Sequence, residues 1–399
     1  MVIYLKGFFT ECKGLVGTTT NGVKMKKKIC FFINSGWYFE LHWLERAKLF
    51  QNDGCEVHII AHFSNVEISN LSAQGFICHN SRMNERTLNL LSVIKDSILS
   101  FKILNIIKPD ILHSITIKPI LIGGLYARFT QTAFISSFVG LGRVFMNQNL
   151  TYKLLNYGVR KLYEFIFKNE KSRLTFEHVN DLIFLTKLIK VSDKQCMVID
   201  GVGVNLRDFK YQKEIDNEPL VVLFAARMLK SKGLEVLVNI NRELKAQGKS
   251  FVLNVAGIEI EDDTDAIAKE DIMKWHNDGL INWLGKRNDI PKLIGECNIV
   301  ALPSVYFEGI PRIIIESSAI GRACIVYDSG GCSSIINDGV NGYVASRGDK
   351  DEFKAKLLSL LANPEVRLQM GLRGRKIVEE RFSLETVYEK TKTLYLNVI

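Results

Sequence analysis

The sequence contains no apolar run that approaches the roughly 18 residues a helix needs to cross a bilayer. Its longest apolar segments, such as Ile29–Ile33 and Leu220–Ala226, have the length of buried strands. We therefore expect no integral membrane anchor. Residues 1–16 combine a short apolar run with lysine and glutamate and have no clear small-residue cleavage site, so they do not resemble a secretory signal.

Cysteines are few and scattered, since the chain has 8 and no C-x-x-C pair. Most lie beside apolar residues, and we interpret them as small core residues in a reducing compartment. A Cys/His metal site needs clustered ligands, and the sequence predicts none. No recognised nucleic-acid-binding pattern is present, so we expect no nucleic-acid partner.

The composition is that of an ordinary globular protein. The chain has 399 residues, of which 47% are apolar and 24% charged. This balance excludes a disordered chain, a collagen and a small disulfide-stapled scaffold. At about 100–200 residues per domain, the length predicts two domains.

The positive charge is concentrated in the first half of the chain. Residues 1–200 carry 25 Lys/Arg and 15 Asp/Glu, a net charge of +10, whereas residues 201–399 carry 27 and 28, a net charge of −1. A basic half can contact an anionic membrane surface or a phosphorylated substrate.

Apolar runs alternate with segments of helical spacing along both halves of the chain. This rhythm is typical of parallel, doubly wound sheets. In the first half we predict strands at 28–33, 56–61 and 111–115, a turn at 34–36, and helices at 38–52, 88–107 and 120–129. In the second half we predict strands at 220–226, 251–257, 281–284, 299–302 and 323–327, and helices at 234–246, 290–297 and 311–321.

These segments predict two Rossmann-like α/β domains. We assign residues 25–200 to an N-terminal acceptor-binding domain, 201–219 to a linker and 220–380 to a C-terminal nucleotide-binding domain. Ligands of such sheets bind outside the carboxyl ends of the strands. Met25 precedes three lysines and the first strand, so we expect a translation start there and residues 1–24 to be an upstream extension.

The strongest candidate site follows the predicted strand 299–302. Pro303–Arg312 forms a loop with Pro311 at the expected start of a helix, where free backbone N–H groups and a partial positive charge suit a phosphate. Glu308 precedes this helix and Glu316 lies inside it. Their carboxylates could address two ends of an extended ligand, while the alternative is a helix cap and a solvent-facing side chain.

A second candidate site follows the strand 220–226. Arg227 and Lys232, with Gly233, place two cations at a strand end, where a diphosphate would need them. Arginine grips phosphate through two donors and lysine supplies a point charge. A solvated basic loop is the alternative.

These motifs together resemble the retaining glycosyltransferases of family four, which have the GT-B fold. The likeness rests on R-x4-K at Arg227 and Lys232, on E-x7-E at Glu308 and Glu316, and on Gly201-Val202-Gly203-Val204-Asn205. Asn205 departs from the family's usual aspartate. Trp37–Phe39, residues 113–118 and Gly140-Leu141-Gly142 resemble the subgroup that builds bacterial surface polysaccharides and lipid-linked glycans.

The resemblance implies roles for particular residues. Arg227 and Lys232 would hold the nucleotide diphosphate, Glu316 the ribose, and Glu308 the donor sugar. Further donor-binding positions are Gly36, Gly309, Ile310, Pro311, Lys286 and Arg287, and acceptor-side positions are His113, Thr116 and Lys118. His113 is as readily a structural histidine. Residues 381–399 would form a helix that crosses back to the N-terminal domain, and the two domains would face a central cleft.

Two further segments bear on metal and membrane. Asp263-Thr264-Asp265 matches the metal-binding D-x-D of another glycosyltransferase fold, but it lies in the acidic loop 259–265 and we interpret it as solvated. Tyr152–Lys171 interleaves Lys153, Arg160, Lys161 and Lys168 with apolar residues at helical spacing. Such a helix either lies on an anionic membrane or packs on the core with its lysines in water.

The resemblance predicts a retaining, metal-independent glycosyltransferase without a cofactor. It would move a sugar from a nucleotide-sugar, expected to be a UDP-sugar, to a polyprenyl-pyrophosphate-linked glycan in O-antigen, capsule or related assembly. We expect a peripheral protein at the inner face of the cytoplasmic membrane. The alternatives are a sugar-nucleotide epimerase of the same architecture and a non-catalytic sugar-nucleotide-binding partner subunit.

Overall fold

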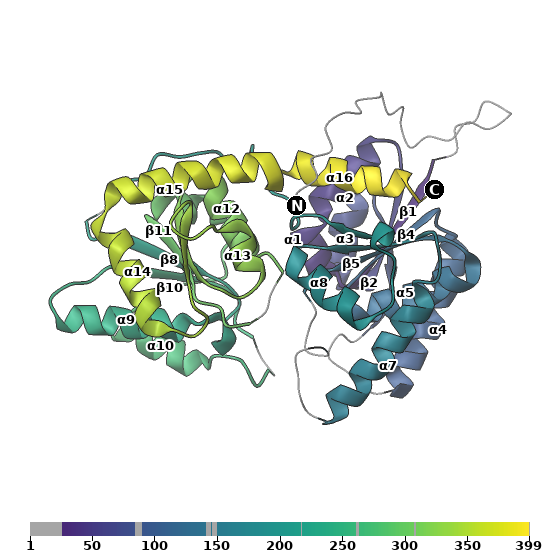
Figure 1. Ribbon diagram of the computed structural model, residues 1–399, viewed down its shortest axis with the longest axis horizontal. Helices are drawn as coiled ribbons and strands as arrows, with labels where there is room; N and C mark the ends of the chain where they lie inside the picture. The colour runs from purple at the N-terminus through teal and green to yellow at the C-terminus, as the bar shows by residue number, and fades with distance from the viewer. Residues whose placement is uncertain are drawn as a thin grey trace. The chain divides into compact units, whose positions relative to one another are not determined.

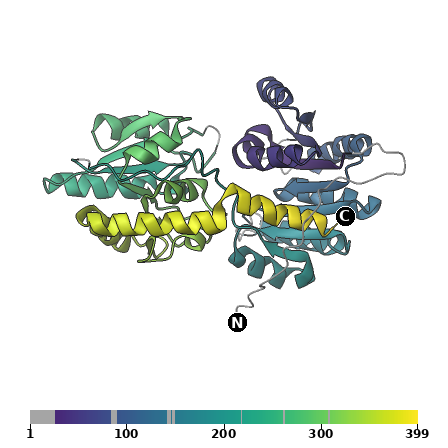
Figure 2. The same ribbon diagram turned by 90° about the horizontal axis from the view of Figure 1, so that it is seen from above.

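The structure is a computed structural model, and it describes residues 26–83, 90–140, 145, 150–216, 218–260, 263–306 and 309–398. The chain divides into two compact units. Unit 1 comprises Met1–Ser136, Ile166–Arg173 and Thr393–Ile399, and unit 2 comprises Ser137–Phe165 and Leu174–Lys392. Figure 1 and Figure 2 show helices on both faces of each of two sheets.

The first sheet has seven strands in the order β3-β2-β1-β4-β5-β6-β7. The strands are β1 (Lys28–Ser35), β2 (Glu56–His62), β3 (Ile77–Asn80), β4 (Ile111–Ile115), β5 (Ala133–Phe138), β6 (Ser172–Phe176) and β7 (Cys196–Val198). The helices between them are α1 (Gly36–His42), α2 (Leu44–Asn52), α3 (Asn65–Ala73), α4 (Leu90–Ile107), α5 (Ile117–Thr130), α7 (Leu150–Ile166) and α8 (Val179–Leu188).

The second sheet has six strands in the order β10-β9-β8-β11-β12-β13. They are β8 (Val221–Ala225), β9 (Val252–Ala256), β10 (Asn282–Gly285), β11 (Ile299–Leu302), β12 (Ala323–Tyr327) and β13 (Gly342–Ala345). Its helices are α9 (Leu234–Ala246), α10 (Lys269–Asn277), α11 (Ile290–Glu296), α12 (Arg312–Ile320), α13 (Gly331–Ile335), α14 (Lys350–Ala362) and α15 (Pro364–Ile377). A π-helical turn, η3 (Val378–Phe382), joins α15 to α16 (Leu384–Leu396), drawn in yellow in both views.

The predicted α/β class is confirmed, because both sheets are built from parallel strands with intervening helices. The predicted bounds of β4, α9, β11 and β12 agree with the structure to the residue. Each of these strands is buried on both faces, which is why its sequence is an almost continuous apolar run. Because both faces of these strands are buried, their continuous apolar runs predicted their positions correctly.

Two local predictions in the first half are wrong. Residues 34 and 35 belong to β1 rather than to a turn, and Gly36 is the first residue of α1. The predicted helix 38–52 is broken at Trp43, whose ring packs on His113 with the centroids 4.9 Å apart and carries the Arg46 guanidinium 4.4 Å from its own centroid. This tertiary packing overrides the helical spacing of the segment.

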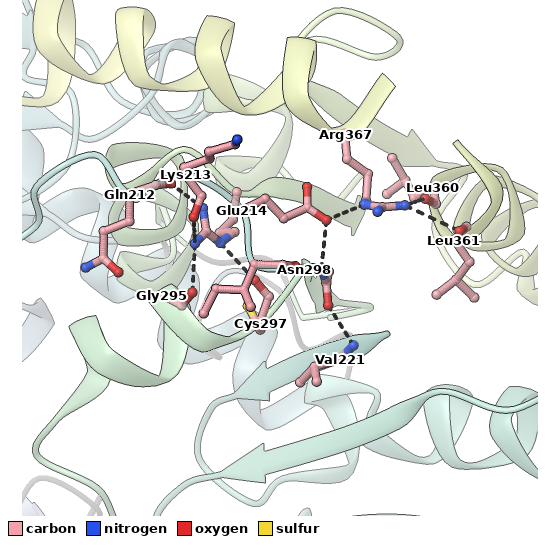
Figure 3. A network of polar contacts seen from close by, with 12 residues as sticks. Gln212, Lys213, Glu214, Val221, Gly295, Cys297, Asn298, Leu360, Leu361 and Arg367 are labelled. Carbon is pink, nitrogen blue, oxygen red and sulfur yellow. Dashed lines mark hydrogen bonds and ion pairs between the residues drawn. The ribbon is translucent and has the colours of Figure 1, made fainter. Parts of the chain in front are cut away.

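Residues 210–216, within the predicted linker, are held against the rest of unit 2 by the buried Arg322 and by the partly buried Glu214. Glu214 accepts hydrogen bonds from Arg367 Nε and Asn298 Nδ2, both at 2.7 Å (Figure 3). Arg322 is 1% exposed and donates to five backbone carbonyls, those of Gln212, Lys213, Ile294, Gly295 and Cys297. Burial lowers the pKa of the Arg322 guanidinium. The chain therefore enters the second sheet along a fixed path.

In the part of the chain that the structure describes, no helix combines the length and the apolar character that a membrane span requires.

We expect Arg367→Met to lower the free energy of unfolding by about 3 kcal/mol, because the partly buried Glu214 would lose its cation and the Leu360 carbonyl its donor. Denaturant unfolding checks this value. Arg373→Met, on the exposed side of the same helix α15, is the control and should change the free energy by less than about 0.5 kcal/mol. Equal losses in the two variants would contradict a stabilising role for the buried pair.

Candidate functional site

The loop after β8 carries the two predicted cations. Arg227 is exposed, whereas Lys232 is 8% exposed and ends the short turn that leads into α9. The loop is held by neighbouring segments: the Met228 amide donates to the Ile258 carbonyl at 2.9 Å, and the Lys230 amide donates to the Asp265 carbonyl at 2.7 Å. The Lys232 side chain therefore starts from a fixed backbone.

The loop after β8 also contacts the loop after β11, which is the next strand in the sheet. The Ser231 carbonyl accepts hydrogen bonds from the Val305 amide at 2.9 Å and from Ser304 Oγ at 3.3 Å. Gly233 has φ +81°, and a Cβ there would lie 2.0 Å from the Pro303 carbonyl oxygen. The structure thus brings together two motifs that lie about 70 residues apart in the sequence, and only glycine permits this approach.

Asp265, which the sequence interpretation placed in a solvated acidic loop, is bonded to the loop after β8. Its carboxylate accepts from the Ser231 amide at 3.3 Å and also bonds the Ser231 hydroxyl. Asp263 in turn accepts from the Asp265 amide at 3.0 Å. The D-x-D is therefore not wholly solvated, because the carboxylates of Asp263 and Asp265 both accept hydrogen bonds from within the protein.

The predicted helix start at Pro311 is confirmed, because Pro311 is the N-cap of α12 and Arg312 its first residue. The preceding Gly309–Ile310 turn packs tightly against Gly331, since a Cβ on Gly331 would lie 2.0 Å from the Gly309 carbonyl oxygen. Glu308 lies outside the described residues. The helix start predicted to face an anion is thus present and built on close-packed backbone.

Glu177, the residue after β6, was not predicted as a site residue. Its side chain contacts the Gly309–Ile310 turn. Its Oε2 accepts a hydrogen bond from the Ile310 amide at 2.9 Å. The side chain is 9% exposed, and a Cβ on Gly309 would lie 2.0 Å from the same oxygen. Pro311 has no N–H, so the Ile310 amide is the last donor before the helix, and a carboxylate already occupies it.

Glu316 lies inside α12 and is 6% exposed. Burial raises the pKa of its carboxyl, and Arg312, which bonds it one helical turn away at 2.5 Å, offsets part of that rise. Its predicted role at a ribose is not tested by this geometry. The alternative of a solvent-facing Glu316 is wrong, because the side chain is buried.

Lys286 and Arg287 follow β10 and are exposed. Arg287 donates two hydrogen bonds to the Asp289 carboxylate, from Nε to Oδ1 at 2.8 Å and from Nη2 to Oδ2 at 2.6 Å. The hydrogen bond raises the pKa of Arg287 and lowers the pKa of Asp289. The predicted donor contacts of both residues stay predictions.

The acceptor-side candidates of unit 1 lie at the carboxyl end of β4. His113 is 1% exposed and its Nδ1 lies 2.5 Å from the Tyr395 hydroxyl, while burial and Arg46 keep its pKa well below the ordinary range. This environment favours the structural reading of His113. Thr116 has φ +72° and a buried hydroxyl without a hydrogen bond. Burial raises the pKa of the Asp96 carboxyl, and the positive charge of Lys118 offsets part of that rise.

The end of β1 lies beside the end of β4 and also holds unsatisfied polar atoms. Asn34 Oδ1 and Ser35 Oγ are buried without a hydrogen bond, as is Ser114 Oγ. Gly36 begins α1, and a Cβ there would lie 2.4 Å from the Phe63 ring, so packing alone requires glycine. Three buried oxygens at these two adjacent strand ends thus accept no hydrogen bond from the described residues.

The described residues contain no group of three His, Cys, Asp or Glu side chains placed to hold a metal ion.

Comparison with known proteins identifies two family models in the chain. The model "Glycosyl transferase 4-like" matches residues 28–174, and "Glycosyl transferases group 1" matches residues 207–377. The chain is 30% identical over 299 residues to the N,N'-diacetylbacillosaminyl-diphospho-undecaprenol alpha-1,3-N-acetylgalactosaminyltransferase of Campylobacter jejuni, covering 71% of this chain and 76% of that protein. It is 28% identical over 116 residues to the UDP-Gal:alpha-D-GlcNAc-diphosphoundecaprenol alpha-1,3-galactosyltransferase of Escherichia coli, covering 29% of this chain and 30% of that protein.

Solved structures share the fold. A glycosyltransferase from Rickettsia africae superposes with a TM-score of 0.74 at 19% identity, covering 94% of this chain and 99% of that one. The Anabaena protein Alr3699/HepE in complex with UDP superposes with a TM-score of 0.73 at 16% identity, covering 93% and 100%. The two sheets described above therefore match the GT-B architecture.

The buried acid beside Glu177 gives a pH prediction. Burial raises the pKa of Asp181 to about 7, with His178 Nε2 at 3.3 Å from its Oδ2. The folded chain thus holds a proton that the unfolded chain releases near pH 4, so this stabilisation is complete at low pH and is lost as the pH rises through 7. We expect the unfolding free energy of the wild type, minus that of Asp181→Asn, to fall between pH 5 and pH 8. Urea unfolding at both values measures it, and a constant difference would contradict the raised pKa.

Proposed function

The chain belongs to the glycosyl transferases whose models match both of its halves, and we propose that it is a retaining, metal-independent enzyme. It transfers a sugar from a UDP-sugar to a polyprenyl-pyrophosphate-linked glycan in O-antigen, capsule or related polysaccharide assembly. The observation that carries the proposal is the fixed contact between the Ser231 carbonyl and the loop 303–305. It places the loop of Lys232 and the loop that leads to α12 at adjacent strand ends.

Lys232 and Arg227 hold the diphosphate in this proposal. As the bond between the anomeric carbon and the phosphate breaks, negative charge grows on the leaving group. Two cations and the amino end of α12 stabilise that charge without reorganising. Because these groups supply the positive charge, the proposed reaction needs no metal ion.

Glu308 and Gly309 hold the donor sugar, and Glu316 binds the ribose. The predicted contact through the Ile310 amide is left out, because this amide already bonds Glu177. Attack by the acceptor hydroxyl occurs on the face from which the diphosphate leaves, so the anomeric configuration is retained. The departing phosphate oxygen takes the proton of the acceptor hydroxyl. Exclusion of water from the site limits hydrolysis of the donor.

The names of the relatives support the proposed donor and acceptor. The Campylobacter and Escherichia coli proteins are named for transfer to diphosphoundecaprenol-linked sugars, the latter from UDP-Gal, and the Anabaena structure contains UDP. These names support a UDP-sugar donor and a lipid-linked acceptor for this chain. His113, Thr116 and Lys118 stay candidates for the acceptor side, with Thr116 the best placed by its unsatisfied hydroxyl.

We expect Lys232→Ala and Glu308→Ala each to reduce transfer by at least about 100-fold, because charge on the leaving group or contact with the sugar is lost. Release of UDP in the presence of lipid-linked acceptor and chelator measures the rate. The control is Lys230→Ala, an exposed lysine of the same loop. Wild-type rates in either site variant, with folding intact, would remove the site assignment. UDP release that depends on acceptor also excludes an epimerase and a non-catalytic subunit.

We propose that the helix α7 holds the enzyme on an anionic membrane at the cytoplasmic face. One side of α7 packs inward through Val159 and Tyr163, and Arg160 is used by the fold because it donates to the Leu188 carbonyl at 2.8 and 3.0 Å. The opposite side exposes Leu154 at 69% and Tyr157 at 61%, with Lys153 and Lys161 beside them. Exposed apolar side chains flanked by lysines suit the interface of an anionic bilayer.

We expect the protein to sediment with vesicles that contain anionic phospholipid and to be released as the salt concentration rises. The double variant Lys153→Glu/Lys161→Glu should bind at least about fivefold more weakly, because each lysine contributes about 1 kcal/mol at an anionic surface. Lys249→Glu, which changes an exposed lysine between α9 and β9, is the control. If salt and the double substitution both leave vesicle binding unchanged, α7 is not the surface that contacts the membrane.

A further inference from the structure

Ser231 joins three loops at the carboxyl edge of the second sheet. The strands β9, β8 and β11 are adjacent and parallel, so the loops that follow them leave the sheet side by side. Within the loop after β8, the Ser231 carbonyl accepts the Val305 amide at 2.9 Å, from the loop after β11. The Ser231 amide donates to Asp265 Oδ1 at 3.3 Å and its hydroxyl bonds Asp265 Oδ2, both in the loop after β9. The residue that precedes Lys232 is therefore held from both sides.

The main chain of the loop after β8 is held by bonds that do not involve the Asp265 side chain. The Ile267 amide donates to the Met228 carbonyl at 3.0 Å, and the Lys230 amide donates to the Asp265 carbonyl at 2.7 Å. The two bonds of the Asp265 carboxylate are additional, and both join it to Ser231. Substitution of the Asp265 side chain therefore leaves the main-chain bonds in place and changes the surroundings of Ser231.

The orientation of Ser231 sets where the Lys232 side chain begins. The peptide group between the two residues has its carbonyl on the Val305 amide, and its N–H donates to the Leu229 carbonyl at 3.0 Å. Rotation of Ser231 away from Asp265 would turn this peptide group and displace the Lys232 Cα. A displacement of about 1 Å at a group that stabilises a transition state can reduce the rate about 100-fold.

The charge of Asp265 has no evident use at this place. Its carboxylate is bonded to the residue before the proposed diphosphate contact, and two negative charges repel each other. What the carboxylate supplies is a pair of acceptors matched to the amide and the hydroxyl of one serine. An asparagine could supply the same two bonds, because its oxygen accepts from an amide and its NH₂ group donates to a hydroxyl oxygen. The bonds and the charge can therefore be separated by substitution.

We propose that Asp265 is a positioning residue that acts through Ser231 to hold Lys232 where the leaving diphosphate gains its negative charge. This inference rests on the proposed function. It gives the D-x-D of this chain a role other than metal binding. The role requires the two hydrogen bonds of Asp265 and does not require its charge.

The test measures kcat and the donor KM for Asp265→Ala, Asp265→Asn, Lys232→Ala and the double variant Lys232→Ala/Asp265→Ala. UDP release is followed in the presence of chelator, with undecaprenyl-diphosphate-linked N-acetylglucosamine as acceptor. The donor is whichever of UDP-glucose, UDP-galactose and their N-acetylamino forms the wild type transfers fastest. Glu270→Ala, which removes an exposed carboxylate in the first turn of α10, is the control, and thermal unfolding verifies that each variant is folded.

We expect Asp265→Ala to lower kcat at least about tenfold while the donor KM stays within about threefold, because the charge that Lys232 meets grows in the transition state. Asp265→Asn should keep kcat within about threefold of the wild type. In the Lys232→Ala background, Asp265→Ala should lower kcat by less than about twofold further, since its effect passes through Lys232.

A wild-type kcat in Asp265→Ala would overturn the inference. So would a full further loss in the Lys232→Ala background, which would show that Asp265 acts independently of that lysine. Equal losses in Asp265→Asn and Asp265→Ala would show that the carboxylate charge itself is needed, as in a metal site. Failure of the wild type to release UDP with every donor would instead overturn the proposed function.

Discussion

The contact between the loop after β8 and the loop after β11 is the constraint on which the candidate site depends. Gly233 approaches the Pro303 carbonyl more closely than any residue with a Cβ could, and the Ser231 carbonyl accepts from the next two residues of the opposite loop. Asp265 bonds Ser231 from a third loop. Lys232 and the approach to α12 are consequently held by backbone geometry, before any ligand binds.

Backbone packing of this kind explains the glycines of the motifs better than flexibility does. Gly331 packs on the Gly309 carbonyl, and Gly309 lies against the Val139 carbonyl and the end of the Glu177 side chain. The same logic holds for the path into the second sheet, where Arg322 and the Glu214–Arg367 pair fix residues 210–216. A rigid frame is what electrostatic stabilisation of a leaving group requires, because donors that must reorganise lose their advantage.

Sequence reasoning was strongest where one local signal decides the structure. The buried strands β4, β11 and β12 and the helix α9 were predicted to the residue, because continuous apolar runs and helical spacing need no knowledge of partners. It failed at Trp43, where packing on His113 and Arg46 breaks a well-spaced helix, and at residues 34 and 35, which extend β1 although they read as a turn. The strands β3, β5, β6, β7 and β13 were not predicted, and serine or threonine interrupts the apolar run of β5 (AFISSF) and β6 (SRLTF).

The sequence by itself determined the α/β class, the two runs of strands and helices, and the family, because R-x4-K and E-x7-E are local spacings within single loops and helices. Tertiary structure alone decided which side chains meet. Glu177 and Ile310 are 133 residues apart and Asp265 lies 34 residues from Ser231, so no spacing rule connects them. It also decided that His113 is buried against Tyr395, 282 residues away. Burial and hydrogen bonding between distant segments depend on how the strands are ordered in the sheet, and that order is not written in any local pattern.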